Sequence, residues 1–119
     1  MKAKVAVCFL LTVSVYSANA QVWIGGAGAT QCGVYLSQRQ NDNNQYEGLT
    51  ATVYTEWANG YMSGYNNFSS QKQFTTTIPR ATLIAFIDKY CRDKPLVQVA
   101  TAVDCLIANH GGPNFNYCK

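Results

Sequence analysis

Cysteines have the clearest chemistry in this 119-residue chain, and their meaning depends on the first twenty positions. Two lysines precede an apolar run over 5–15, and residues 18–20 (Ala-Asn-Ala) give the small-x-small pattern that signal peptidase recognises. We therefore expect residues 1–20 to be a signal peptide that is cleaved before Gln21. The apolar run is too short to span a bilayer, so stable membrane insertion is not expected. The mature chain would then reside in an oxidising compartment, and we expect the bacterial periplasm.

Four cysteines remain after that cleavage, because the fifth lies within the apolar run. In a short exported chain, four cysteines indicate two disulfides, for which three pairings exist. We favour Cys32 with Cys91 and Cys105 with Cys118, because the His-Gly-Gly-Pro stretch at 110–113 lets the chain turn back between the second pair. A zinc site is disfavoured, since the chain has no C-x-x-C pair and a single histidine.

The remaining reactive side chains form no recognisable catalytic set. His110 stands beside two glycines at a predicted helix end, where it would interact favourably with the helix dipole. The six carboxylates show no pairing suited to acid–base catalysis, although Glu56 and Asp104 could meet between two helices. The sequence contains no G-x-x-x-x-G-K-[ST] phosphate loop. We therefore expect a protein that is not an enzyme and that has no metal and no cofactor.

Aromatic residues gather in one stretch of the chain, which includes Tyr54, Trp57, Tyr61 and Tyr65. Tyrosine and tryptophan are enriched at the energetic centres of protein interfaces. These four residues therefore predict a protein-binding surface. Packing in the core is the alternative account of the same side chains, and the sequence leaves both open.

The charge of the chain disfavours two classes of partner. Without residues 1–20 the chain has seven basic and six acidic residues, a formal net charge of +1. The basic residues are scattered, whereas a nucleic-acid interface usually needs a clustered basic face. No basic amphipathic helix indicates attachment to a membrane surface. Other proteins are the expected partners.

The elements that must position these residues are predicted to be helices. A glycine-bearing leader over 21–29 is expected to be flexible and to lie outside the domain, with Trp23 touching the domain. Helices are expected over 30–39, from Leu49 to about 67, from Pro79 to about 93, and from Pro95 until Gly111 stops the last one. Thr30 is expected to cap the first helix. The predicted fold class is all-α: a single small four-helix domain over 30–119, clamped by two disulfides.

Apolar spacing assigns each helix a buried face. The first is expected to bury Cys32, Leu36 and Tyr35. The second is expected to bury Leu49, Val53, Trp57, Tyr61 and Gly64, with Gly60 and Gly64 giving a flat strip for close packing. The third is expected to bury Leu83, Ile84, Ile87 and Cys91, with Asp88, Lys89, Arg92 and Asp93 in solvent. The fourth is expected to bury Leu96, Val99, Val103, Leu106 and Ile107.

Three motifs then occur in a characteristic order. They are Cys-Gly-Val-Tyr-Leu at 32–36, Trp-Ala-Asn-Gly-Tyr-Met-Ser-Gly-Tyr-Asn at 57–66, and Tyr-Cys-Arg-Asp-Lys-Pro-Leu at 90–96 before an alanine-rich helix. This order resembles the HdeA/HdeB-like family of small bacterial periplasmic proteins, over roughly residues 31–108.

The resemblance implies a small helical fold in the periplasm, with a disulfide between the first and third helices that Cys32 and Cys91 would carry. It also implies an acid-activated chaperone that works without ATP. In that mechanism, protonation and positive charge loosen a homodimer, whose exposed apolar faces then hold unfolding clients. The disulfide near the C-terminus is additional to the family pattern.

Small exported immunity proteins have a similar Y-x-x-G helix and C-x-x-x-P junction, and they give the alternative. On that interpretation, the chain is an immunity or inhibitor protein that neutralises a secreted toxin or a cell-wall hydrolase.

Overall fold

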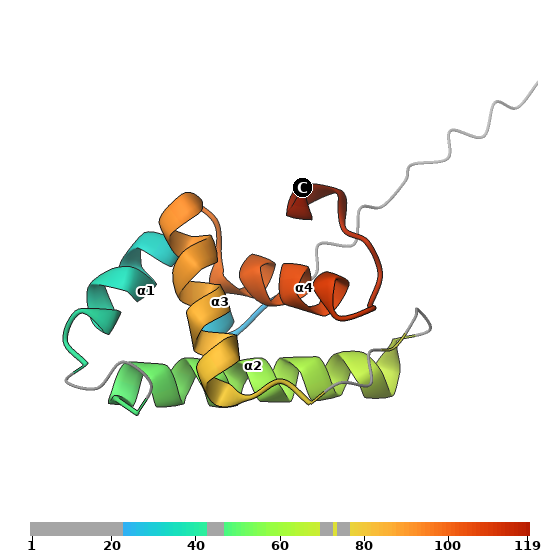
Figure 1. Cartoon of the computed structure of the whole chain (residues 1–119), viewed down its shortest axis with the longest axis horizontal. Helices are drawn as coiled ribbons and strands as arrows, with labels where there is room; N and C mark the ends of the chain where they lie inside the picture. Colours follow the sequence, from blue (N-terminus) through green and yellow to red (C-terminus); the bar gives the residue numbers. More distant parts are fainter. Residues whose placement is uncertain (1–22, 43–46, 70–72, 74–76) are drawn as a thin grey trace, which may run out of the picture.

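The computed structural model describes residues 23–42, 47–69, 73 and 77–119, so the predicted signal peptide and its cleavage site lie outside the described residues. Within those ranges the chain forms four α-helices and no β-strand (Figure 1). The helices are α1 (Cys32–Arg39), α2 (Leu49–Phe68), α3 (Arg80–Asp93) and α4 (Val99–Asn109), and the short 3-10 turns are η1 (Gly26–Ala29) and η2 (Asn116–Cys118). The predicted all-α class is confirmed.

The longest helix, α2, lies across the other three helices and contacts each of them (Figure 1). α3 packs against α1 on one side and against α4 on the other. The core therefore sits where the four helices meet. Its fully or almost fully buried side chains include Tyr35, Tyr54, Ala58, Met62, Leu83, Ile87, Val99, Val103, Leu106 and Ile107.

Both favoured disulfide pairings are confirmed. Cys32 is bonded to Cys91, 59 residues later, which joins α1 to α3. Cys105 is bonded to Cys118, 13 residues later, which joins α4 to η2. In the loop-entropy description, closures of these lengths stabilise the fold by about 4 and about 3 kcal/mol, before any strain in the folded state is subtracted. No disulfide involves α2.

The fourth helix begins later than predicted, at Val99 rather than Pro95. The intervening residues serve α1 instead, because the carbonyls of Val97 and Pro95 accept hydrogen bonds from the N–H groups of Cys32 and Gly33, each at 2.8 Å. Leu96 is consequently 83% exposed, and its predicted place in the core is wrong. Thr30 does not cap α1 with its side chain, and its carbonyl accepts from Val99 N–H.

The end of α4 matches the prediction. Gly111 has a φ of +97°, the left-handed conformation that glycine adopts without strain. Gly112 N–H then reaches the Ile107 carbonyl at 2.9 Å, which is the Schellman pattern of helix termination. His110 Nδ1 lies 2.8 Å from the Leu106 carbonyl, so the imidazole sits on the last helical turn.

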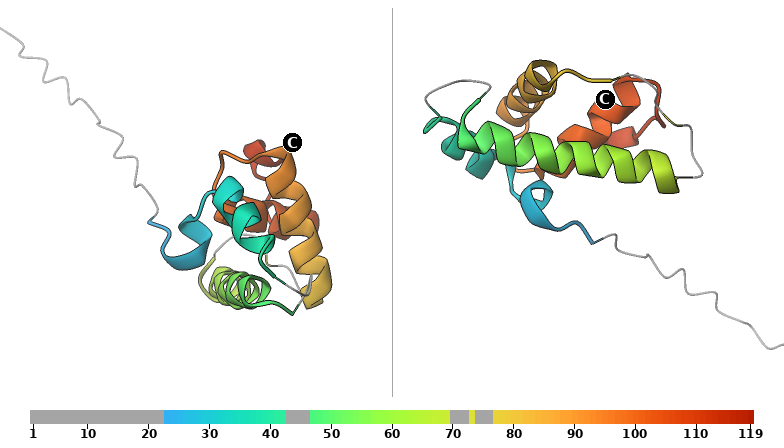
Figure 2. Two further views of the ribbon diagram at one scale, coloured as in Figure 1. Left: turned by 90° about the vertical axis from the view of Figure 1, so that its left-hand side faces the viewer. Right: turned by 90° about the horizontal axis from the view of Figure 1, so that it is seen from below.

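The expectation of a leader separate from the domain is wrong for residues 25–29, while residues 21 and 22 lie outside the described ranges. η1 packs against α2 and α4, on the flank of α2 opposite α3 (Figure 2). Gly28 is buried, and a Cβ atom built there would lie 1.9 Å from the Trp57 ring. Glycine is therefore required for the close approach. Trp23 is 87% exposed, and its ring lies beside Gly25.

The buried face of α2 differs from the predicted one. The residues it buries are Ala51, Tyr54, Thr55, Ala58 and Met62. Leu49 and Val53 are instead 78% and 48% exposed. Cβ atoms built at Gly60 and Gly64 would meet nothing within 4 Å, so the glycine strip faces open space and packs against no other element of the described chain. The apolar residues of α2 occur nearly all round the helix, so their spacing alone does not select the core side.

Candidate functional site

A buried cation joins three elements at the end of α1. The Arg39 guanidinium donates to both Asp88 carboxylate oxygens, at 3.1 and 3.0 Å, and to Asp42 Oδ2 at 2.9 Å. The side chains of Arg39, Asp42 and Asp88 are only 7, 5 and 12% exposed. Asp88 is on α3, and Asp42 lies before α2. The cluster therefore connects α1, α3 and the start of α2, and we call it the Arg39 cluster.

Asp42 also caps α2 from six residues before its N-cap. Its carboxylate oxygens accept from the backbone N–H groups of Thr50 and Ala51 at 3.1 and 3.0 Å. These are the second and third residues of α2, the donors that an N-cap side chain normally satisfies. The N-cap residue itself is Gly48, which has no side chain to do so. The negative charge at this helix end also interacts favourably with the helix dipole.

The Arg39 cluster favours the ionised forms of Asp42 and Arg39. Burial tends to raise the pKa of Asp42, but hydrogen bonds from Ala51, Thr50 and Arg39 outweigh it, and the net pKa is lowered. Burial tends to lower the pKa of Arg39, and the bond and charge of Asp88 outweigh this effect and raise it. Tyr35 donates to Asp88 Oδ1 at 2.6 Å, and burial followed by this bond raises the pKa of its phenol.

The prediction that Asp88 lies in solvent is wrong, since only 9% of the residue is exposed. Sequence reasoning therefore missed the Arg39 cluster. The available signal was the spacing of Tyr35 and Arg39, which are four residues apart and so share one face of α1. Lys89, Arg92 and Asp93 are exposed, as predicted.

A second carboxylate joins α2, α4 and the C-terminal segment. Asp104 accepts hydrogen bonds from the Tyr61 and Tyr117 hydroxyls, each at 2.8 Å. Lys94 Nζ also donates to the Tyr117 carbonyl at 3.1 Å. Burial raises the pKa of Asp104, and the two tyrosine bonds counteract part of this rise. Glu56 lies on the exposed side of α2, so the carboxylate pair considered from the sequence is replaced by a carboxylate with two phenols.

The four aromatic residues predicted to form a protein-binding surface lie in different environments. Tyr54 is 3% exposed, packs edge-on against Tyr35 with ring centroids 4.6 Å apart, and so belongs to the core. Trp57 stacks on Tyr61 at 5.0 Å and donates from Nε1 to the Gly25 carbonyl at 2.9 Å. Trp57, Tyr61 and Tyr65 are partly buried against the core. The structure therefore removes Tyr54 from the predicted surface and leaves Trp57, Tyr61 and Tyr65 only partly exposed.

Two further findings concern ligands and membranes. Within the residues that the structure describes, no group of three or more His, Cys, Asp and Glu side chains could hold a metal ion. None of the helices described is both long enough and apolar enough to cross a bilayer.

Comparisons of the chain with models of known families, with characterised proteins and with solved structures find no match.

Proposed function

We propose that this protein is an exported, non-enzymatic protein-binding domain of the HdeA/HdeB-like kind, which holds unfolding proteins in the periplasm under acid stress. The Arg39 cluster is the observation that carries the proposal. It places a buried cation between two carboxylates, at the point where α1 and α3 meet the start of α2.

Acid would weaken this junction. A carboxyl group whose pKa is lowered by folding stabilises the fold above its unfolded pKa of about 3.9, and that contribution is lost as the pH falls through the folded value. Asp42 belongs to this class. Protonating Asp42 would break its ion pair with the Arg39 guanidinium and weaken the cap of α2. Loss of this charged contact costs about 1–2 kcal/mol, a sizeable part of the 5–15 kcal/mol that stabilises a typical domain.

The helix released by this change would be α2. The disulfide between Cys32 and Cys91 keeps α1 on α3, whereas α2 is held by non-covalent contacts. Its inner face carries the apolar side chains Tyr54, Ala58 and Met62. Movement of α2 would uncover this face and the core beneath it, which gives an unfolding client an apolar surface. In acid the mature chain would also carry about +9, from seven Lys and Arg, His110 and the amino terminus, which favours expansion.

Asp104 acts in the opposite sense. Because burial raises its pKa, its contribution to stability is greatest when it is protonated, and that contribution is lost as the pH rises through the folded value. Acidification therefore does not weaken the fold through Asp104. Opening would begin at the Arg39 end of α2, while the contact between α2 and α4 persists longer.

The test is suppression of client aggregation at pH 2–3 and at pH 7. We expect the protein to suppress aggregation only in acid. The variants Asp42→Asn and Asp88→Asn, which hold no negative charge at any pH, should be active at a higher pH than the wild type. Asp93→Asn, which changes an exposed carboxylate on α3, is the matched control. Equal aggregation of the client with and without this protein in acid would exclude the proposed chaperone activity.

A second candidate function is an immunity or inhibitor protein, and the outer face of α2 favours it. Leu49, Val53 and Phe68 are exposed there, next to glycines that face open space. A folded partner could pack closely on this face at neutral pH. Tight capture of a single toxin or cell-wall hydrolase from periplasmic extract at pH 7, lost in Gly60→Trp, would favour this function over the chaperone.

A further inference from the structure

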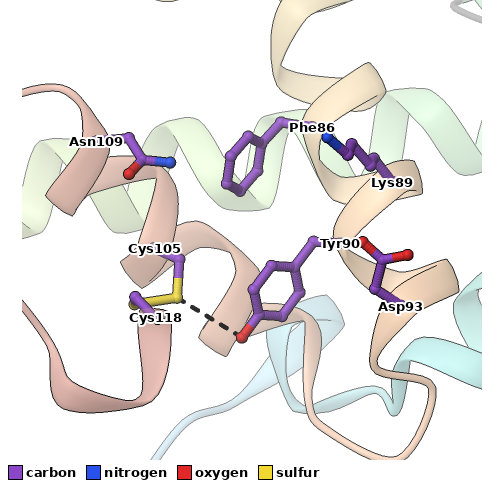
Figure 3. A pocket seen from close by; sticks show the side chains of 7 residues that line it. All are labelled: Phe86, Lys89, Tyr90, Asp93, Cys105, Asn109 and Cys118. Atoms are coloured by element: carbon purple, nitrogen blue, oxygen red, sulfur yellow. Dashed lines mark hydrogen bonds between the residues drawn. A yellow bond between two sulfur atoms is a disulfide. The ribbon is translucent and has the colours of Figure 1, made fainter.

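A pocket of about 230 Å³ lies between α3 and α4 (Figure 3). Phe86 and Tyr90 project from α3 and form one wall, with nearly parallel rings whose centroids are 6.2 Å apart. The disulfide between Cys105 and Cys118 forms the opposite wall. The Tyr90 hydroxyl lies 3.6 Å from Cys105 Sγ, and only the hydroxyl can donate in this contact because the sulfur has no hydrogen.

Three polar side chains surround these apolar walls. Lys89 and Asp93 line the pocket from α3, and Asn109 lines it from α4. Among the residues that the structure describes, none of the three side chains has a hydrogen-bond or ion-pair partner. Lys89 and Asp93 are four residues apart on one helix, so their Cβ atoms are about 5–6 Å apart.

This combination is typical of a small-molecule site, where apolar and aromatic walls supply contact area and a few polar groups fix the orientation. The pocket is smaller than the 300–1,000 Å³ or so that drug-sized ligands fill, which limits the occupant to about one amino-acid residue. An aromatic ring suits the wall of Phe86 and Tyr90, because offset stacking favours such pairs. A carboxylate suits the Lys89 ammonium, and an N–H donor suits Asp93.

We propose that this pocket binds an aromatic residue that carries a free carboxylate and an adjacent N–H donor. Two sources share that chemistry: a free aromatic amino acid, and the C-terminal aromatic residue of a peptide. The pocket exists in the closed fold and uses no residue of the Arg39 cluster. The inference is therefore independent of the proposed acid-activated function, and binding is expected at neutral pH.

The test is a titration of the full mature protein at pH 7, followed by the amide signals in ¹H–¹⁵N NMR spectra. The probes are L-phenylalanine, N-acetyl-L-phenylalanine and L-phenylalaninamide. We expect saturable shifts of the amide signals of residues 86–93 and 105–109 with L-phenylalanine, with N-acetyl-L-phenylalanine or with both. The shifts with L-phenylalaninamide should be much weaker, because this probe lacks the carboxylate. Binding of L-phenylalanine alone identifies the free amino acid, and equal or tighter binding of the acetylated probe identifies a chain terminus.

Lys89→Glu should weaken binding of the carboxylate probes about threefold to fivefold, the range for a partly exposed ion pair. Arg92→Glu is the matched control, because it makes the same charge change on the same helix at a side chain outside the pocket. Both positions are exposed, so neither variant should affect folding. Shifts that do not saturate, or equal weakening by the two variants, would overturn the proposal.

Discussion

Asp42 serves two elements at once, because its carboxylate both pairs with Arg39 and caps the first turn of α2. The position of the helix start therefore depends on the same charge that balances the buried guanidinium. Gly48 makes this arrangement possible. A Cβ atom built at Gly48 would lie 2.2 Å from Asp42 Cγ, so any side chain there would displace the carboxylate.

Asp42→Asn should lower the free energy of unfolding at pH 7 by about 1–2 kcal/mol, because the amide oxygen can accept from only one of the two α2 N–H groups and the amide cannot neutralise Arg39. The difference from the wild type should shrink below about pH 4, since the wild-type carboxylate loses its contribution there. Urea denaturation at pH 7 and pH 3 measures both values. A difference that stays the same at the two pH values would contradict the assigned role of the charge.

Gly48→Ala should destabilise the protein by about 1–2 kcal/mol at pH 7, because the new methyl group forces Asp42 away from Thr50 and Ala51. Combined with Asp42→Asn, it should add much less than its effect in the wild type, since both changes disrupt one contact. A double-mutant cycle in urea measures this coupling. Additive effects would show that Gly48 acts independently of Asp42.

At the scale of elements, the packing of η1 on α2 depends on Trp57. The indole lies over Gly28, donates to the Gly25 carbonyl and stacks on Tyr61. Tyr61 in turn donates to Asp104 on α4. A continuous set of contacts therefore runs from η1 through α2 to α4, and the disulfide of α4 extends it to the C-terminal segment.

Gly28→Ala should destabilise the fold by about 1–3 kcal/mol, because the methyl group would overlap the Trp57 ring and force it to move. Thermal unfolding gives the size of the effect, and a shift in tryptophan emission reports the displaced indole. Gly60→Ala is the matched control. It adds a methyl group into open space within α2 and should stabilise the protein by about 0.5–1 kcal/mol. Loss of stability in both variants would contradict this packing.

Sequence reasoning worked where apolar spacing was the dominant signal. The stripe of α3 from Leu83 to Cys91, the disulfide between Cys105 and Cys118 and the stop at Gly111 followed from local patterns. It failed where a distant partner decides the position of a residue. Leu96 is exposed because its neighbours bond to α1, and η1 packs through glycines that leave no apolar pattern.

The candidate site was harder to predict for the same reason. Asp88 lies at the boundary of α3 between the buried face, which includes Ile87, and the polar face, which includes Lys89. The spacing of residues in α3 is therefore as consistent with a solvent-exposed Asp88 as with a buried one. Only Arg39 and Tyr35, about fifty residues earlier, determine that it is buried.

For the whole molecule, the disulfide between Cys32 and Cys91 limits how far the chain expands in acid. Replacing both cysteines by serine should lower the free energy of unfolding by roughly 4 kcal/mol at pH 7. At pH 2 the variant should have a clearly larger radius of gyration than the wild type, because repulsion among positive charges is then unopposed by the cross-link. Small-angle scattering at the two pH values measures this. Equal radii in acid would show that the cross-link does not limit expansion.

Export and oxidation also make a prediction about the isolated molecule. On the proposed export, protein purified from the periplasm should begin at Gln21 and contain no free thiol, because signal peptidase would remove residues 1–20 and the compartment is oxidising. Intact-mass spectrometry with and without alkylation measures both properties. Retention of residues 1–20 would contradict the expected cleavage before Gln21. Alkylation of the protein without prior reduction would contradict the absence of free thiols.

The same cross-link has a consequence for proteolysis. α2 lies wholly within the loop that Cys32 and Cys91 close. A single cut anywhere in that loop leaves the two fragments joined, so the nicked chain stays one molecule until it is reduced. Two cuts, one on each side of α2, would instead let that helix dissociate as a peptide. The cross-linked chain therefore stays covalently whole after one cleavage here, and a doubly nicked sample would yield the remaining three-helix body for direct study.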